Sequence, residues 1–260
     1  MKFDTLKDKC LYYRSLTDTR LVPNSYVLVM LDGRSFSSMI KNKFKLPFDD
    51  NFIDMMNETA KYVCENVSGC KLAYVQSDEI SLVLTDFDTP TTDSFFGYRT
   101  SKLLSIIASL ATAKFNQLMT LYNMSNGLGM NPGDCIMKTK LAQFDCKVWN
   151  VPTLNDVYAW FLYRQNDCIK NSKGQLAQTY YSHKELFKLT TDQQIEKLNV
   201  EKSINWYEFD DNKKYGRLIT KQTITTENGV VCERLEWVIN DAFVLNENRE
   251  KFISHIPNNI

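Results

Sequence analysis

Short apolar runs alternate with longer amphipathic stretches along the first half of the chain. Residues 26–31 read YVLVML, and such a continuous run with aromatic and β-branched residues is typical of a buried strand. Residues 72–75 and 80–84 are two further apolar runs around the polar sequence QSDE, a pattern that predicts a hairpin. Residues 142–149 predict a fourth strand, which should end near Pro152.

Segments with helical periodicity lie between these strands. Asp49 and Asp50 offer N-caps for a helix whose apolar positions recur at spacings of three and four until Gly69. A long helix is expected from about Ser94 to Tyr122, followed by a glycine- and proline-containing loop at 126–133. The resulting order βαββαβ predicts an α+β fold of the ferredoxin-like type, in which the first and third strands are central neighbours.

The second half of the chain is predicted to add helices. A helix should run from Thr153 to roughly Asn171. Two short helices are predicted by capping-box patterns, in which a hydroxyl residue precedes Glu or Gln by three positions. These pairs are Ser182 with Glu185 and Thr191 with Gln194.

A final hairpin is predicted near the C-terminus, with alternating strands at 218–225 and 230–239 around a turn at 227–229. No change in composition requires a linker. We therefore expect residues 1–150 to form a catalytic core and residues 151–260 to form a helical and β-hairpin extension packed on it as one unit.

The bulk composition narrows the possible functions. Lys and Arg together number 31, as do Asp and Glu, so the formal net charge is zero and the chain is not a globally basic nucleic-acid coat. A local basic face stays possible. Hydrophobic residues make up 43% of the chain, which is typical of a globular protein and not of a disordered one.

The cysteines and the N-terminus indicate a compartment. Seven cysteines occur without a CxxC pair, and there are only two histidines, His183 and His255, so no structural zinc site is expected. Such cysteines indicate a reducing environment. The sequence shows no secretory signal and no apolar run long enough to cross a membrane. We expect a cytoplasmic protein, and mitochondrial import without an evident presequence is the alternative.

Candidate chemistry lies in carboxylates at the strand ends. Asp32 closes the first strand, and Asp78 and Glu79 lie at the tip of the hairpin. In a βαββαβ sheet these acids can converge and hold two Mg²⁺ ions about 4 Å apart, which suits phosphoryl chemistry. Gly33 would let phosphate or metal approach the backbone closely. The alternative is that all three acids are solvated turn residues.

Cations are needed to balance a triphosphate. Arg99 and Lys102 lie three residues apart near the start of the long helix, and the backbone of residues 33–37 can offer N–H groups. The cluster Lys41, Lys43 and Lys45 is a weaker phosphate-binding candidate. A solvated helix edge explains the same charges, so both interpretations stay open on this pattern alone.

Several motifs together resemble the tRNA-His guanylyltransferase superfamily. They are LDGRSF at 31–36, AYVQSDEISLVL at 73–84, RTSK at 99–102, AQFDCKVWNVP at 142–152 and YRQNDCIKNS at 163–172. The resemblance is strong over the first 185 residues and weak after them. It implies a polymerase-palm core that adds nucleotides to RNA in the 3′-to-5′ direction, using two Mg²⁺ ions with ATP, GTP and other nucleoside triphosphates as substrates.

The resemblance also implies roles for individual residues. It makes Asp32, Asp78 and Glu79 catalytic, with Asp32, the Gly33 carbonyl and Asp78 as the metal ligands. Nucleotide contacts are implied for Asp32, Gly33, Arg34, Ser35, Phe36, Ser37, Ser77, Asp78, Arg99 and Lys102. Contacts to the tRNA partner are implied for Arg164, Asn171, His183 and Lys184. Members of the superfamily form tetramers, so a homotetramer is expected.

One departure from the superfamily affects the substrate. True tRNA-His guanylyltransferases carry HINNLYN after the RQ-DC segment, whereas Cys168 is followed here by Ile169, Lys170, Asn171 and Ser172. This version resembles guanylyltransferase-like proteins that repair 5′-truncated tRNAs from a template, after activation of the 5′ end with ATP. We expect that activity. The alternatives are addition of a single G to tRNA-His, another palm chemistry such as nucleotide cyclisation, and a non-catalytic tRNA-binding paralogue.

Overall fold

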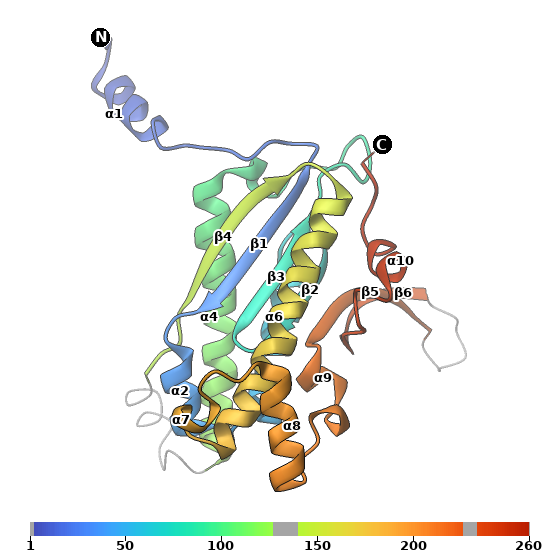
Figure 1. Cartoon of the computed structure of the whole chain (residues 1–260). Coiled ribbons are helices and arrows are strands. Elements are labelled where there is room, and N and C mark those ends of the chain that lie inside the picture. Colours follow the sequence, from blue (N-terminus) through green and yellow to red (C-terminus); the bar gives the residue numbers. More distant parts are fainter. Residues whose placement is uncertain (1–2, 127–139, 226–232, 260) are drawn as a thin grey trace.

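A six-stranded antiparallel sheet runs through the molecule in the strand order β4-β1-β3-β2-β5-β6 (Figure 1). The structure is a computed structural model that describes residues 3–126, 140–225 and 233–259. The strands are β1 Tyr26–Gly33, β2 Cys70–Gln76, β3 Glu79–Leu84, β4 Phe144–Val151, β5 Arg217–Thr225 and β6 Glu233–Asp241. Because β5 pairs with β2, the C-terminal hairpin continues the sheet of the first half.

Helices cover both faces of this sheet. The helices α3 and α4 pack on one face and α6 crosses the other (Figure 1). The helices of the first half are α1 Leu6–Ser15, α2 Phe36–Lys43, α3 Asp50–Asn66 and α4 Thr100–Ser125, with the 3₁₀ turn η1 Phe95–Tyr98. Those of the second half are α6 Leu154–Tyr180, α7 His183–Leu186, α8 Thr191–Lys202, α9 Asp211–Lys214 and α10 Arg249–Ile253, with the 3₁₀ turn η2 Trp206–Glu208.

The alternation of side chains along β1 explains the two-sided core. Val27, Val29 and Leu31 belong to the apolar cluster with α3 and α4, whereas Tyr26 and Leu28 belong to the cluster with α6. Successive side chains of a strand point to opposite faces. Asp32, two residues beyond Met30 on the same face as Leu28, therefore comes out at the strand end on the α6 side.

The predicted order of the first four strands and their two main helices is the order observed. The strands β1 and β3 are neighbours, and Asp32 is paired directly with Glu79. Asp49 caps α3 as predicted, because its side chain accepts a hydrogen bond from the Phe52 backbone N–H at 3.1 Å. The capping box of Ser182 with Glu185 is also present at α7.

The expected boundaries of two long helices need correction. The helix expected from Ser94 begins at Thr100, because positive φ angles at Phe96 and Gly97 break the chain into a separate turn. The helix expected to end near Asn171 continues to Tyr180, because buried Leu176 and Ala177 give its last turns a packed face.

Further corrections concern short helices. The second capping box is formed by Thr190 with Gln193, one residue before the predicted pair. The helix α2 begins at Phe36, shortly after Gly33, and was not predicted. Its eight residues are too few to show a clear helical periodicity. The helix α1 was not predicted either, because it has no buried face. The predicted turn at 227–229, residues 230–232 and the loop at 127–133 lie outside the described residues.

The start of β5 depends on a close approach of two backbones. Gly216 has a φ of +83°, and a Cβ there would lie 2.6 Å from the Tyr74 hydroxyl oxygen and 2.7 Å from the Val75 carbonyl oxygen. A glycine is therefore required for β5 to reach β2. Within the described ranges, no helix combines the length and apolar character needed to cross a bilayer.

Candidate active site

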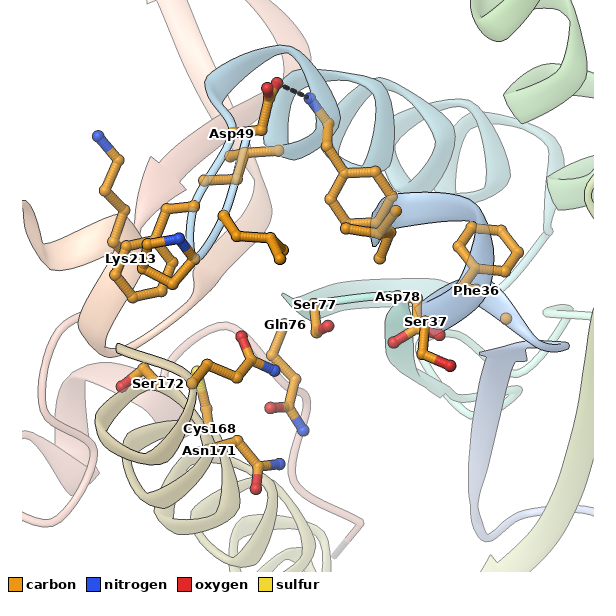
Figure 2. A pocket seen from close by; sticks show the side chains of 18 of the residues that line it. Phe36, Ser37, Asp49, Gln76, Ser77, Asp78, Cys168, Asn171, Ser172 and Lys213 are labelled. Atoms are coloured by element: carbon orange, nitrogen blue, oxygen red, sulfur yellow. Dashed lines mark hydrogen bonds between the residues drawn. The ribbon is translucent and has the colours of Figure 1, made fainter. Parts of the chain in front are cut away.

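A cavity of about 600 Å³ lies where β1 and the β2–β3 hairpin end (Figure 2). Its walls come from α2, the segment that leads into α3, the second half of α6, and α9 with the start of β5. Its polar lining includes Asp32, Ser35, Ser37, Lys41, Lys45, Gln76, Ser77, Asp78, Asn171, Ser172, Gln175, Asn212, Lys213 and Arg217. A cavity of this size suits a nucleotide-sized ligand.

Asp32 and Asp78 meet at one end of this cavity. The turn between β2 and β3 folds back on β1, so that the Gly33 backbone N–H donates to the Asp78 carbonyl oxygen at 3.1 Å. Ser77 has a φ of +45°, which gives the turn its tight shape. In Figure 2 the side chains of Asp78 and Ser37 lie next to one another inside the cavity. The sequence prediction that these two strand ends converge is confirmed.

The two carboxylates lie in a field that favours a bound cation. Burial raises the pKa of Asp32, and the negative charge of Asp145 raises it further, while Lys147 and Arg164 oppose the rise. Burial also raises the pKa of Asp78, with Asp32 adding to the effect. Because both pKa values are raised, the protein does not fully balance the negative charge of the two ionised carboxylates. A divalent cation would supply the missing positive charge.

The turn after β1 is packed tightly against an aromatic cluster. A Cβ on Gly33 would lie 2.5 Å from the Phe36 ring, so only glycine fits there. The Phe36 ring is buried against Phe115 and Phe144, at centroid distances of 5.1 and 5.0 Å. This packing fixes the first turn of α2 beside Asp32. Phe36 thus supports this turn from the core, and Ser35, Phe36 and Ser37 all line the cavity.

Arg34 points to a different place from its neighbours. Its Nη1 donates to the Gln143 side-chain oxygen at 3.1 Å, and its backbone N–H donates to the Gln143 carbonyl. Arg34 is exposed and does not line the cavity. In this conformation the Arg34 side chain is therefore not positioned for the nucleotide contact that the resemblance implies.

Glu79 and Arg164 form a buried ion pair beneath the site. The Arg164 Nε donates to Glu79 Oε1 at 2.6 Å and its Nη2 donates to Glu79 Oε2, while Nη2 also donates to Asp167 at 3.1 Å. Burial raises the pKa of Glu79, and the Arg164 guanidinium opposes that rise. The Arg164 side chain, for which the resemblance implies a tRNA contact, is instead buried and bound to Glu79 and Asp167 inside the protein.

The helix α6 supplies the opposite wall. Asn171 and Ser172 line the cavity (Figure 2), and Gln175 lines it one helical turn later. Asn171, predicted from the sequence, is therefore brought to the same cavity as Asp32 and Asp78. His183 and Lys184 lie on α7, beyond the end of α6, and are not part of this cavity.

Arg99 and Lys102 are not brought to Asp32 within one chain. Arg99 forms a backbone bridge with Arg20 before β1 begins, and its Nε is 3.5 Å from Asp18. The length of β1, about 20 Å from Tyr26 to Asp32 at ~3.4 Å per residue, separates this position from the cavity. Arg99 and Lys102 therefore lie near the opposite end of β1 from Asp32, because α4 begins beside Arg20, before β1 starts.

The comparisons with known proteins agree with this arrangement. Residues 11–152 match the family model described as tRNAHis guanylyltransferase. The chain belongs to the tRNAHis guanylyltransferase family. Members of this family are nucleotidyltransferases, and the matched residues span β1 through β4 with both strand-end carboxylates.

Two solved structures and one curated relative resemble this chain over most of its length. A bacterial tRNA(His) guanylyltransferase-like protein in complex with ATP is 30% identical with a TM-score of 0.83, over 97% of this chain and 99% of that one. The structure in complex with GTP is 29% identical with a TM-score of 0.79, over the same shares of the two chains. The tRNA(His) guanylyltransferase of Debaryomyces hansenii is 26% identical over 80% of this chain and 78% of its own length.

Two residues of this family member's site were missed by sequence reasoning. Asp145 is paired with Asp32 across β1 and β4, and alternation in the sequence FDCKV could have identified it only once the register was known. Arg217 is 4% exposed in the cavity wall, and its Nε donates to Asn57 at 2.8 Å. No carboxylate forms an ion pair with it among the residues described, and no sequence signal identifies such a position.

The donor set fits Mg²⁺ that is shared with substrate phosphates. Within the described residues, no three His, Cys, Asp or Glu side chains lie close enough together to hold a metal ion by themselves. Asp32 and Asp78 offer two carboxylates, and Gly33 lines the same cavity. Mg²⁺ is commonly bound in this way, by one or two carboxylates with phosphate oxygens and water completing the shell.

Proposed function

We propose that this protein is a template-dependent 3′-to-5′ nucleotidyltransferase that adds nucleotides to the 5′ end of truncated tRNA, on a polymerase-palm core. The observation that carries the proposal is the cavity that joins Asp32 and Asp78 on the sheet to Asn171, Ser172 and Gln175 on α6. It is supported by family membership and by the likeness over nearly the whole chain to a protein in complex with ATP.

The proposed reaction forms one bond and breaks one. The 3′-oxygen of an incoming nucleoside triphosphate bonds to the α-phosphorus at the RNA 5′ end, and the bond to the leaving pyrophosphate, or to AMP after activation with ATP, breaks. Asp32, Asp78 and the Gly33 carbonyl would hold two Mg²⁺ ions, which neutralise phosphate charge and lower the pKa of the attacking hydroxyl.

The chain's own residues would position the reactants. The backbone of the α2 first turn and the Ser35, Ser37 and Ser77 hydroxyls would contact the triphosphate, since all three side chains line the cavity. Lys41 and Lys45 add positive charge at the same wall. Glu79 would act as a positioning residue, because its carboxylate is bonded to Arg164 instead of facing the cavity.

The α6 wall supports template-directed addition over a strict preference for G. The residues at 171, 172 and 175 are Asn, Ser and Gln, which can hydrogen-bond to several bases and phosphates. Among the residues that the structure describes, no histidine lines the cavity. A paired template selects the base without a dedicated side chain. Addition of G to tRNA-His is the second candidate, and the family description favours it.

We include a homotetramer in the proposal. In the superfamily pattern Arg99 and Lys102 contact triphosphate, yet β1 separates them from Asp32 of the same chain. A second copy would have to bring them to the cavity. Such a shared site makes assembly a requirement for activity and not only for stability.

The deciding experiment is an extension assay on a tRNA that lacks its first 5′ nucleotide. We expect Mg²⁺-dependent addition of whichever nucleotide pairs with the opposing base, so that changing this base changes the nucleotide added. Asp32→Asn should reduce the rate by at least ~10³-fold, because it removes a negative charge that would hold the metal ions in the transition state. The exposed carboxylate of Asp93 provides a control variant, Asp93→Asn, which should retain full activity.

Two results would overturn the proposal. Addition of G alone, to tRNA-His alone and regardless of the opposing base, would assign the protein to the second candidate function. Undiminished extension by Asp32→Asn would remove the metal-binding carboxylate from the reaction.

A further inference from the structure

A second cavity, of about 500 Å³, opens where α6 ends and α7 and α8 begin. Gln178 lines both this cavity and the catalytic one, so the two adjoin along α6. In Figure 1, α7 and α2 lie at the same end of the molecule. The second cavity is lined mainly by Gln178, Tyr181, His183, Phe187, Lys188 and Gln194.

Phe187 has no place in the apolar core. Its side chain is 62% exposed although it follows a helix that is anchored by buried Leu186. Its ring lies 6.3 Å from the His183 ring, and the Lys188 ammonium is 5.6 Å from its centroid. Lys188 has a φ of +66°, a costly conformation for a residue with a side chain. An exposed aromatic ring with a cation beside it is the arrangement that nucleobase-stacking sites use.

The electrostatic surroundings favour a phosphate-bearing ligand. His183, Lys184 and Lys188 are exposed and form no ion pair in the described part of the chain. The nearby carboxylates are already engaged: Glu185 accepts from the Ser182 backbone N–H and hydroxyl, and Glu201 accepts from the Tyr181 hydroxyl and pairs with Lys197. Glu185 keeps its negative charge and Glu201 is paired with Lys197, so the two cations Lys184 and Lys188 outnumber the one unpaired carboxylate and the net charge near the Phe187 ring is positive.

One polar atom in the wall lacks a partner. The Gln194 Nε2 donates to the Leu189 carbonyl at 3.1 Å, but its Oε1 is buried with no hydrogen-bond partner among the described residues. A buried acceptor of this kind is costly unless a donor reaches it. A nucleobase amino group or a ribose hydroxyl provides such a donor once the Gln194 amide turns its Oε1 toward the cavity, since that atom has no solvent access in this conformation.

We propose that this second cavity binds one unpaired nucleotide of the RNA substrate, on the strand opposite the truncated 5′ end. Its base stacks on Phe187, a donor of the nucleotide reaches Gln194, and Lys184 and Lys188 contact the neighbouring phosphates. A base can stack on a side chain only where it is free of its own duplex. The bound nucleotide is therefore one of the single-stranded 3′ end beyond the template position, because the nucleotide directly opposite the truncation has to pair with the incoming one. This inference rests on the proposed function, and it names the substrate feature that the site would hold.

The test measures equilibrium binding of RNA, not catalysis, so that it can be judged separately from the proposed function. Fluorescence anisotropy should show that Phe187→Ala weakens binding of the truncated tRNA by about tenfold, the effect of losing one base–aromatic stack of ~1–3 kcal/mol. Phe187→Trp should bind as well as the wild type, and Phe187→Leu as poorly as alanine. The exposed aromatic Tyr13 on α1 gives the control variant Tyr13→Ala, which should bind normally.

Two further measurements separate stacking from other roles. A tRNA with a fully paired, blunt acceptor end should bind the wild type and Phe187→Ala equally. Binding of ATP should be unchanged in every Phe187 variant, since Phe187 does not line the catalytic cavity.

Three outcomes would overturn the proposal. They are normal binding of truncated tRNA by Phe187→Ala, an equal loss with blunt tRNA, and a change in oligomeric mass on replacing Phe187, which would assign the ring to a contact between copies. A protein that shows the expected Phe187 dependence but never extends tRNA would retain this site and refute the proposed function instead.

Discussion

At the scale of single residues, the site depends on two carboxylates whose negative charge the protein does not fully balance. Asp32 and Asp78 face each other in a partly buried pocket, and burial raises the pKa of both. Glu79 differs, because Arg164 grips both of its carboxylate oxygens. Asp78 and Glu79 are neighbours at the hairpin tip but differ in their surroundings. Asp78 lines the cavity, where a cation can reach it, whereas the Glu79 carboxylate is paired with Arg164.

The Glu79–Arg164 pair yields a stability prediction. Arg164→Met should lower the free energy of unfolding by about 3–5 kcal/mol, because it leaves a buried carboxylate unpaired. The double variant with Glu79→Gln should recover part of this loss, since no buried charge is then left alone. Urea denaturation of the two single variants and the double variant measures the coupling. A surface arginine that only bound tRNA would leave the unfolding free energy unchanged when replaced.

At the scale of elements, two glycines illustrate opposite constraints. Gly216 lets β5 approach β2 in a left-handed conformation, and any Cβ there meets Tyr74 and Val75. Gly174 lies inside α6 with nothing within 4 Å of its Cβ position. The first glycine is required by the tertiary structure, whereas the second only weakens a helix.

The matched substitutions should therefore have opposite signs. Gly174→Ala is expected to stabilise the protein by about 0.5–1 kcal/mol, because alanine restricts the unfolded chain and favours helix. Gly216→Ala should destabilise it by more than that amount, because its native φ is incompatible with a Cβ. Thermal unfolding monitored by circular dichroism would show the two shifts. A stabilised Gly216→Ala variant would contradict the observed β2–β5 contact.

At the scale of the whole molecule, one chain does not bring together every residue that the family pattern implies. The cavity unites the end of β1, the hairpin tip and α6, while Arg99 and Lys102 remain at the other end of β1. The proposed assembly would place these cations from one copy beside the carboxylates of another.

Mixing two inactive variants tests this arrangement. One protein carries Asp32→Asn and the other carries Arg99→Ala with Lys102→Ala; each alone should be inactive. After co-refolding in equal amounts, half of the pairs are mixed and one of their two sites is intact, so about a quarter of the wild-type rate should return. If the variants stay inactive when mixed although sedimentation shows mixed assemblies, the cations and carboxylates do not share a site between copies.

The sequence by itself determined the strands, the main helices and the strand-end acids. Alternation and periodicity report which side chains are buried, and the order βαββαβ makes β1 and β3 neighbours, so the meeting of Asp32 with Asp78 could be predicted. The short helix α2 could not be predicted, since eight residues carry too little periodicity to distinguish a helix from a loop.

Only the tertiary structure decided which charged residues face the cavity. Arg164 and Arg217 look like surface cations in the sequence, yet one is paired with Glu79 and the other is buried in the cavity wall. Asp145 joins the site through strand register, and Arg99 is removed from it by the length of β1. Local patterns fix which side of an element is apolar, but the partner of a charge depends on contacts between residues far apart in the chain, and these exist only in the folded molecule.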